Sequence, residues 1–299
     1  MLRSVRTIVA VAALFAAACG GGAKAPSEAH APSKEPVVQT RAKVLKKRDA
    51  ALRTFAAPSG AHLNYYGGNV ISNVKVNVVF WTAAVDGTTQ ANIGGFYSAV
   101  TNSSYMDWLS EFNTGTQSIG RGSLNSVTTI NPGNPNSALN DSDIQAELDA
   151  QIGAGALPPN DGNSIYMTYF PPGYTITQGT SQSCVGGGFC AYHGTYNGVS
   201  AGELFYGVMP DEGPGSGCDT GCGNDTQFNN LTSVSSHELI EAVTDAEVGL
   251  ATSFGPPLAW YDPTYGEIGD ICNAQHGTAA GYVVQLEFSN VRNDCIANY

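Results

Sequence analysis

Apolar and polar residues follow patterns along the chain that predict both strands and helices. Residues 74–81 form a valine-rich run typical of a buried strand, and residues 88–112 carry apolar side chains at helical spacing with a break near Asn102. The same helical spacing recurs over residues 231–244. Further strands are expected at residues 126–130, 164–170, 203–209 and 282–288, and a further helix at 141–152, capped by Asn140 or Asp141. Strands alternate with helices early and cluster later, which predicts an α+β fold with a mixed, twisted sheet packed with helices.

The first 40 residues have the composition of an export signal followed by a tether. Residues 1–19 contain two arginines, an apolar run too short to span a bilayer, and then Cys19. Three alanines before Cys19 predict a lipoprotein cleavage box with a lipid on that cysteine, and ordinary signal cleavage is the alternative. Residues 20–40 are rich in Gly, Ala, Pro and Glu, which predicts a flexible tether.

A basic segment, residues 41–53, separates the tether from the rest of the chain. It has some helical character, and three readings stay open: a pro-segment lying on the acidic body, a juxtamembrane patch, or a solvated linker. Residues 54–299 contain no further linker. We therefore expect them to form a single domain.

Charge divides the chain at the same place. From residue 54 onward there are three basic against twenty-two acidic side chains, a formal net charge of −19. Such a body repels nucleic acid and anionic membranes, so neither is an expected partner and membrane contact is expected only through a lipid on Cys19. A cationic substrate or metal ions suit it better, although acidic surfaces also serve solubility.

Cysteine usage agrees with export. Removing Cys19 leaves six cysteines, an even number that predicts three disulfides in an oxidising compartment. Fifteen pairings are allowed, and the simplest joins near neighbours: 184 with 190, 218 with 222, and 272 with 295. The alternative is that Cys218 and Cys222 are metal thiolates.

The sharpest chemical pattern is Ser-His-Glu-Leu-Ile-Glu at residues 236–241. On a helix, His237 and Glu241 are four residues apart and lie on one face, so both can ligate one metal ion. Glu238 follows the histidine and can act as general base on a water at that ion. The pattern is the metallopeptidase motif H-E-x-x-H with its second histidine replaced by glutamate.

A zinc site needs a third protein ligand and an open position for water. The acidic stretch at residues 260–272 supplies candidates: Glu267 first, Asp270 second and Asp262 behind them. One histidine with two carboxylates is a hard ligand set, so calcium, manganese and iron stay open beside zinc. His193 is a candidate to stabilise developing charge near the metal or to ligate it.

A competing motif, Gly-Val-Ser-Ala-Gly at residues 198–202, matches the nucleophile elbow of serine hydrolases. That elbow requires a helix directly after the serine. A strand is expected there instead, which argues against Ser200 as a nucleophile.

Two further segments join the motifs above: Tyr-Tyr-Gly-Gly at residues 65–68 and the tail from Tyr282 through Cys295. With these features, the chain resembles bacterial relatives of the Exordium or phosphate-induced family over about residues 65–299. The resemblance implies an extracellular location and a zincin-like segment at His237, Glu238 and Glu241. Ala246 stands where the resemblance leads us to expect proline. The family name does not itself imply catalysis.

Together these patterns predict a secreted or lipid-anchored zincin-like metallohydrolase at the cell surface, most simply a peptidase acting on peptides or proteins. Glu238 and His193 are the predicted catalytic residues. His237, Glu241, Glu267 and Asp270 are the candidate zinc ligands. The alternative is a non-catalytic extracellular module that binds cell-envelope or matrix polymers, with a structural or calcium-loaded acidic cluster.

Overall fold

The computed structural model describes Val44–Lys46 and residues 56–299. The expected signal peptide, the cleavage box at Cys19, the tether and most of the basic segment lie outside the described residues. The three described residues of the basic segment form a strand, where the sequence suggested helical character.

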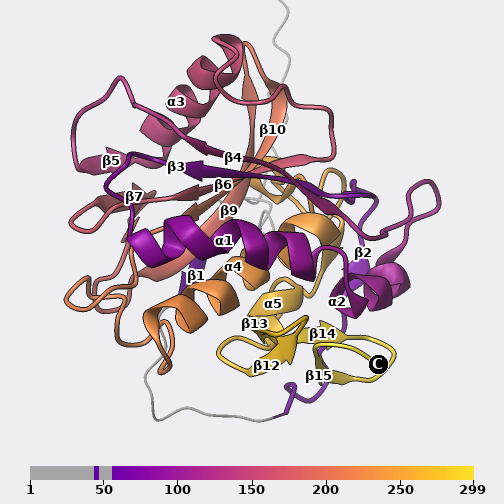
Figure 1. Ribbon diagram of the computed structural model, residues 1–299. Coiled ribbons are helices and arrows are strands. Elements are labelled where there is room, and N and C mark those ends of the chain that lie inside the picture. The colour runs from indigo at the N-terminus through magenta and orange to yellow at the C-terminus, as the bar shows by residue number, and fades with distance from the viewer. Residues whose placement is uncertain (1–43, 47–55) are drawn as a thin grey trace, which may run out of the picture. The chain divides into compact units, whose positions relative to one another are not determined.

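The main sheet has six strands in the order β1-β9-β10-β6-β3-β4 (Figure 1). Its strands are β1 (Val44–Lys46), β3 (Lys75–Phe80), β4 (Ser123–Thr129), β6 (Ser164–Tyr169), β9 (Phe189–Gly198) and β10 (Gly202–Met209). Strand β3 pairs in parallel with β4 and β6, and β6 pairs in parallel with β10. Strand β9 runs antiparallel to both β10 and β1, so the expected mixed sheet is confirmed.

Helices cover both faces of this sheet, because alternate residues of its buried strands point to opposite sides. On β3, Val76 and Val78 pack in one core with α1 (Gly87–Val100) and α4 (Gln227–Thr244). Val79 packs in a second core with α3 (Asp141–Gly153). Figure 1 shows α3 on one side of the sheet and α1 with α4 on the other.

Local capping sets the helix boundaries. The side chains of Asn140 and Asp143 form a reciprocal capping box that starts α3, which confirms Asn140 as the cap. The expected break near Asn102 is also confirmed, since α1 ends at Val100 and Ser103 caps the short α2 (Ser104–Asp107). A 3-10 helix, η1 (Trp108–Phe112), follows directly.

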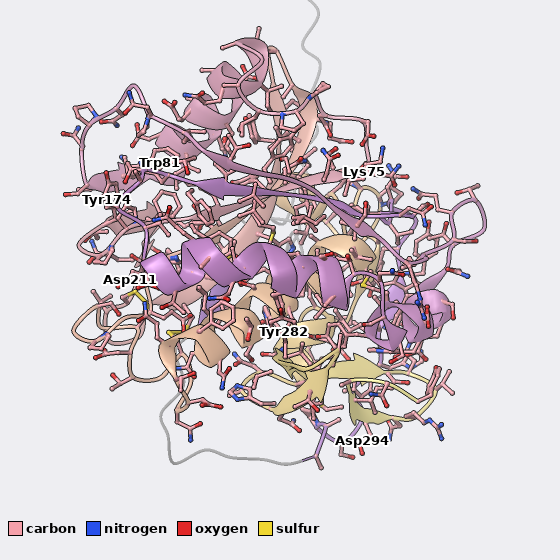
Figure 2. The ribbon with its side chains drawn as sticks, viewed as in Figure 1. Lys75, Trp81, Tyr174, Asp211, Tyr282 and Asp294 are labelled. Atoms are coloured by element: carbon pink, nitrogen blue, oxygen red, sulfur yellow. A yellow bond between two sulfur atoms is a disulfide. The ribbon has the colours of Figure 1, made fainter. Side chains whose placement is uncertain are left out.

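The C-terminal part of the chain adds small elements beside α4. They are η2 (Val248–Leu250), β11 (Trp260–Tyr261), α5 (Ile268–Ile271), β12 (His276–Ala279), β13 (Tyr282–Gln285), β14 (Glu287–Ser289) and β15 (Asp294–Ile296). Two further small sheets contain β2 (Asn64–Tyr65), which pairs with β11, and β5 (Ala138–Asn140), β7 (Thr175–Gln178) and β8 (Ser181–Gln182). Tyr282, which Figure 2 labels, packs edge-on against Phe96 of α1 with ring centroids 5.5 Å apart. The C-terminal strands therefore complete the core on the α1 and α4 side.

One expected strand needs correction, and one strand was not predicted. The run at residues 282–288 is two strands, because Leu286 leaves both ladders and donates its N–H to the carbonyl of Gln275. Strand β9 was not foreseen, since it contains glycines, Asn197 and His193 and is buried on both faces along most of its length.

The pairing of the disulfides also differs from the simplest arrangement. Cys184 bonds Cys218 and Cys190 bonds Cys222, while the expected Cys272–Cys295 bond is confirmed. The physical reason is the hairpin of β9 and β10, which brings the residues that enter β9 beside the residues that leave β10. Because these disulfides use Cys218 and Cys222, neither is a metal thiolate.

Helix α4 is the central element of the domain. It begins one turn earlier than expected, where the Thr226 hydroxyl accepts a hydrogen bond from the N–H of Asn229. Every residue from Asn230 to Thr244 is buried. The polar side chains on this helix must therefore find partners inside the protein. No helix among the residues placed by the structure is long and apolar enough to cross a membrane.

Candidate metal centre

The motif of α4 lies in the interior of the protein. His237 and Glu238 are 0 % exposed and Glu241 is 1 % exposed. Helical spacing brings His237 Nε2 to 3.2 Å from Glu241 Oε2, as expected for residues four apart. The motif is therefore a packed polar cluster rather than a feature of the surface.

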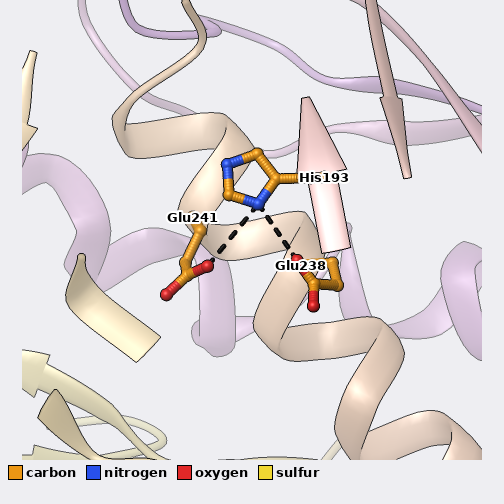
Figure 3. A group of neighbouring side chains, drawn as sticks. All are labelled: His193, Glu238 and Glu241. Carbon is orange, nitrogen blue, oxygen red and sulfur yellow. Dashed lines mark hydrogen bonds and ion pairs between the residues drawn. The ribbon is translucent and has the colours of Figure 1, made fainter. Parts of the chain in front are cut away.

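Strand β9 contributes His193 from the facing side. Alternation along the strand directs His193 to the same face as Ala191, toward α4, while Tyr192 points to the opposite core. His193 Nδ1 lies 3.0 Å from Glu238 Oε2 and 3.5 Å from Glu241 Oε2 (Figure 3). The predicted catalytic pair, His193 and Glu238, is thus in direct contact.

The short helix α5 brings the two acids that the sequence offered as further ligands. Glu267 Oε1 lies 3.4 Å from His193 Nε2. The N–H of Asp270 donates to Glu241 Oε1 at 3.0 Å. A capping box between Glu267 and Asp270 fixes their spacing at the start of α5.

Two overlapping groups of these side chains can hold a metal ion. One is His237, Glu241 and Asp270, and the other is His193, Glu238 and Glu241, each with ligand atoms within 4.8 Å of one another. Two ligand atoms on a tetrahedral zinc ion are about 3.3 Å apart. His237 Nε2 and Glu241 Oε2 of the first group are 3.2 Å apart, and His193 Nδ1 of the second group lies 3.0 and 3.5 Å from its two carboxylates. The donor set therefore fits a small divalent cation.

Several buried atoms at the centre make no hydrogen bond to the described residues. They include Glu238 Oε1 and two imidazole atoms, His193 Nε2 and His237 Nε2, which lie 3.4 and 3.2 Å from carboxylate oxygens of Glu267 and Glu241 without hydrogen-bond geometry. Buried polar atoms in proteins are almost always satisfied, so each such atom needs an explanation. A shared cation is one that accounts for all three together.

The charge balance points the same way. The cluster contains two imidazoles and the acids Glu238, Glu241, Glu267, Asp270 and Glu287. From residue 56 onward, the described cationic side chains are engaged elsewhere: Lys75 with Asp161, Arg121 with Asp107, and Arg292 over the ring of Tyr299. None of those three lies at the cluster, so the negative charge must be balanced by the two imidazoles when protonated or by a cation that binds there.

The protonation equilibria reflect this excess of negative charge. Burial disfavours the charged form of His193, yet Glu267 and Glu238 outweigh it and hold the His193 pKa well above its usual value. Burial likewise opposes charge on His237, but Glu241 and other carboxylates raise its pKa well above the usual range. Burial raises the pKa of Glu238, against the opposing effect of His193. Protons bound to these side chains therefore offset the negative charge of the cluster, as a bound cation would.

Three residues beside the cluster, Gln285, Glu287 and Tyr105, were not predicted from the sequence, and Gln285 contacts His237 directly. Gln285 Nε2 lies 2.6 Å from His237 Nδ1 and donates to the carbonyl of Gly269 at 2.9 Å. Glu287 Oε1 accepts a hydrogen bond from the Tyr105 hydroxyl at 3.0 Å. Gln285 and Glu287 were recognisable as polar residues two apart in an apolar strand pattern.

Gly269 makes this arrangement sterically possible. A Cβ atom at Gly269 would lie 2.5 Å from His237 Nδ1 and 2.9 Å from Glu287 Oε2. These separations are far below van der Waals contact. Only glycine lets the backbone of α5 approach the imidazole this closely.

The remaining sequence candidates lie outside the cluster. The carboxylate of Asp262 accepts hydrogen bonds from the N–H groups of His62, Thr264 and Tyr265, so it shapes its own loop. Ser200 sits in the turn between β9 and β10 with no helix behind it, as expected. The nucleophile elbow is therefore absent at this position.

The structure thus assembles all six residues predicted for the site, and it groups Asp270 rather than Glu267 with His237 and Glu241. Which acid completes the coordination stays a prediction. Comparisons with protein-family models, with curated proteins and with solved structures gave no match for this chain.

Proposed function

We propose that the chain is an extracellular metal-dependent hydrolase, most simply a peptidase, built around the cluster on α4. The observation that carries the proposal is the convergence of His237, Glu241 and Asp270 beside the contact between His193 and Glu238. This arrangement separates a ligand set from an adjacent acid and base pair, which is the division of roles that metal-assisted hydrolysis requires.

His237, Glu241 and Asp270 are the residues that would hold the ion, with Glu267 as the alternative acid. We propose zinc, because imidazole with carboxylates suits its tetrahedral site and His237 Nε2 lies 3.2 Å from Glu241 Oε2, close to the spacing of about 3.3 Å between two ligands of such an ion. Calcium is the alternative, since it favours carboxylate oxygens. When bound, zinc would supply Lewis acidity and lower the pKa of a coordinated water to about 7.

Glu238 is the proposed general base. One of its oxygens faces His193 at 3.0 Å and the other makes no hydrogen bond to the described residues. Burial raises its pKa, and a carboxylate with a raised pKa holds a proton more readily at neutral pH. Glu238 can therefore take a proton at Oε1 and return it to a leaving group.

His193 is proposed to stabilise negative charge while the proton moves. Its pKa is held well above the usual value by Glu267 and Glu238, in spite of burial, which favours the imidazolium form. A positive imidazolium next to Glu238 would offset charge that develops on the substrate.

The substrates proposed are basic or neutral peptides, because the body of the protein carries a strong net negative charge. Three disulfides support an oxidising compartment. We therefore place the activity outside the cell or on the bacterial surface. The resemblance to Exordium-like proteins supports the same location.

One observation favours a second candidate, a non-catalytic module in which the ion is structural and the protein binds envelope polymers. His193, His237, Glu238 and Glu267 are all 0 % exposed, whereas catalytic zinc sites keep one position open to water and substrate. As a hydrolase, the protein would have to open a path to the cluster.

Elemental analysis combined with one isosteric substitution separates the candidates. Glu238→Gln should retain the metal and lose cleavage of a peptide library by about a hundredfold or more, because general-base catalysis contributes on that order. Glu147→Gln, on α3 and remote from the cluster, serves as the matched control. Unchanged cleavage in Glu238→Gln would remove Glu238 from the mechanism. Bound metal without any cleavage would favour the structural role.

A further inference from the structure

The strand that contains His193 has an edge on which another strand is added. On one side β9 pairs with β10, and on the other it pairs with the three residues of β1. The partners of β1 are Phe189, Ala191 and Tyr192, so this pairing ends directly before His193. Whatever occupies this edge therefore pairs with the residue directly before His193, a member of the candidate metal centre.

β1 is attached to the edge by few interactions. It is three residues long, and its register shifts between Leu45 and Lys46. A strand this short gains little from its own ladder and relies on a side-chain anchor. Leu45 provides the anchor, since it is 4 % exposed and packs in the core that includes Cys190 and Ala191.

The sequence of the added strand has a distinct chemistry. Leu45 and Val44 are surrounded by basic residues in Arg-Ala-Lys-Val-Leu-Lys-Lys-Arg, residues 41–48. The body to which β1 pairs carries a formal charge of −19 from residue 54 onward. Backbone pairing along a sheet edge gives affinity, and burial of the leucine side chain together with the charge gives selectivity.

We propose that the outer edge of β9, from Phe189 to Tyr192, is a binding surface for an extended peptide with a leucine-sized side chain among basic residues, and that β1 occupies this surface as a built-in competitor. The surface itself does not depend on the metal. Its use for a substrate rests on the proposed hydrolase, since a peptide paired here is delivered beside His193.

The competitor works because it belongs to the same chain. A tethered segment acts at an effective concentration of about a millimolar, so a free peptide of similar affinity cannot displace it at micromolar levels. Cutting the chain after residue 48 would remove this advantage. The edge would then become available to peptides from outside.

The first test uses the full chain and a fluorescent peptide with the sequence of residues 41–48. Leu45→Asp removes the apolar anchor, and Leu45→Met is the volume-conserving control. Fluorescence anisotropy should show the peptide binding Leu45→Asp at least about tenfold more tightly than the unsubstituted chain or Leu45→Met, because the internal competitor is lost. A peptide with aspartate in place of its leucine should not bind.

Hydrogen exchange locates the binding. Those amides of residues 189–192 that point toward β1 should exchange faster in Leu45→Asp and should be protected again when the peptide is added. Equal affinity for all three proteins, or binding that leaves these amides unprotected, would overturn the proposal. Binding at equilibrium requires no turnover, so failure here leaves the hydrolase proposal standing, and loss of cleavage in Glu238→Gln tests that proposal separately.

A second variant covers the case in which Leu45→Asp does not fold. A recognition sequence for a site-specific protease is inserted between Arg48 and Asp49, and the folded protein is then cut. The N-terminal fragment should dissociate in the presence of excess peptide, as followed by size-exclusion chromatography and mass spectrometry. Retention of the fragment at saturating peptide would contradict the competitor role.

Discussion

Gly269 offers the most direct test of how the cluster is built. Replacing it with alanine adds one methyl group to α5, and the backbone there is not in the left-handed region that disfavours other residues. Alanine is also the better helix former by about 1 kcal/mol. Any loss of metal binding would therefore come from the contact of the new methyl group rather than from backbone strain.

The size of the effect follows from the distances. The added Cβ would lie 2.5 Å from His237 Nδ1 and 2.8 Å from His237 Cε1. A normal contact is about 3.5 Å, so the imidazole and α5 must separate by about 1 Å. Metal–ligand distances tolerate only about 0.2 Å, and changes to groups that orient a ligand cost about 10- to 100-fold in affinity.

The assay is zinc affinity measured by competition with a chromophoric chelator, together with thermal unfolding of the same samples. We expect Gly269→Ala to bind zinc about 10- to 100-fold more weakly than the unsubstituted chain. Gly87→Ala is the control, because a Cβ at Gly87, the first residue of α1, meets no atom within 4 Å. Zinc affinity within about twofold of the control would refute the reasoning that His237 is a ligand held by this close approach.

Three further predictions concern pH, a buried acid and a disulfide. Zinc affinity should fall by up to about tenfold per pH unit as the pH drops from about 8 to about 6. The reason is that the His237 pKa is held well above its usual value, so protons compete with the metal for the imidazole. An affinity independent of pH would exclude His237 as a ligand. Glu212 is buried, and neither of its carboxylate oxygens makes a hydrogen bond to the described residues. Its pKa is raised well above the usual value, mainly by burial and to a smaller extent by the negative charge of Asp211. Because the folded-state pKa of Glu212 is raised, the protein loses stability as the pH rises and this carboxyl group ionises. Glu212→Gln should therefore stabilise the protein by about 1–3 kcal/mol near pH 8 and by less near pH 5, in thermal melts compared with an exposed control, Asp294→Asn. An equal gain at both pH values would contradict this. Replacing both Cys272 and Cys295 with alanine removes a disulfide that links residues 23 positions apart. The free energy of unfolding, measured by urea titration, should fall by about 3 kcal/mol. An unchanged midpoint and slope would show that the disulfide is not formed.

The elements that sequence predicted well are those with a strong period and local stop signals. Residues 74–81 read as a buried strand because valine dominates there, and β3 occupies nearly the same span. The helix at α3 was bounded correctly by Asn140, whose capping role depends only on residues three positions apart. The motif on α4 required only helical spacing to place His237 and Glu241 together.

The parts that sequence could not give depend on contacts between distant segments. Strand β9 is buried on both faces, so it has no polar alternation, and the sequence pointed to His193 without showing that a strand would bring it against α4. The pairing of Cys184 with Cys218 requires the hairpin of β9 and β10 to be known first. The choice between Glu267 and Asp270 depends on the path of α5 past α4, which no local pattern encodes.

The two interleaved disulfides have a consequence for how the protein matures. Cys184–Cys218 and Cys190–Cys222 join the entrance of the β9 hairpin to the segment that leads into α4, so the strand with His193 and the helix with His237 are covalently stapled near one end. Assembly of the two halves of the cluster is thereby coupled to oxidative folding. Protein made in a reducing cytosol would lack this staple and would expose four thiols that themselves attract zinc, so metal content is informative only for material recovered from an oxidising compartment.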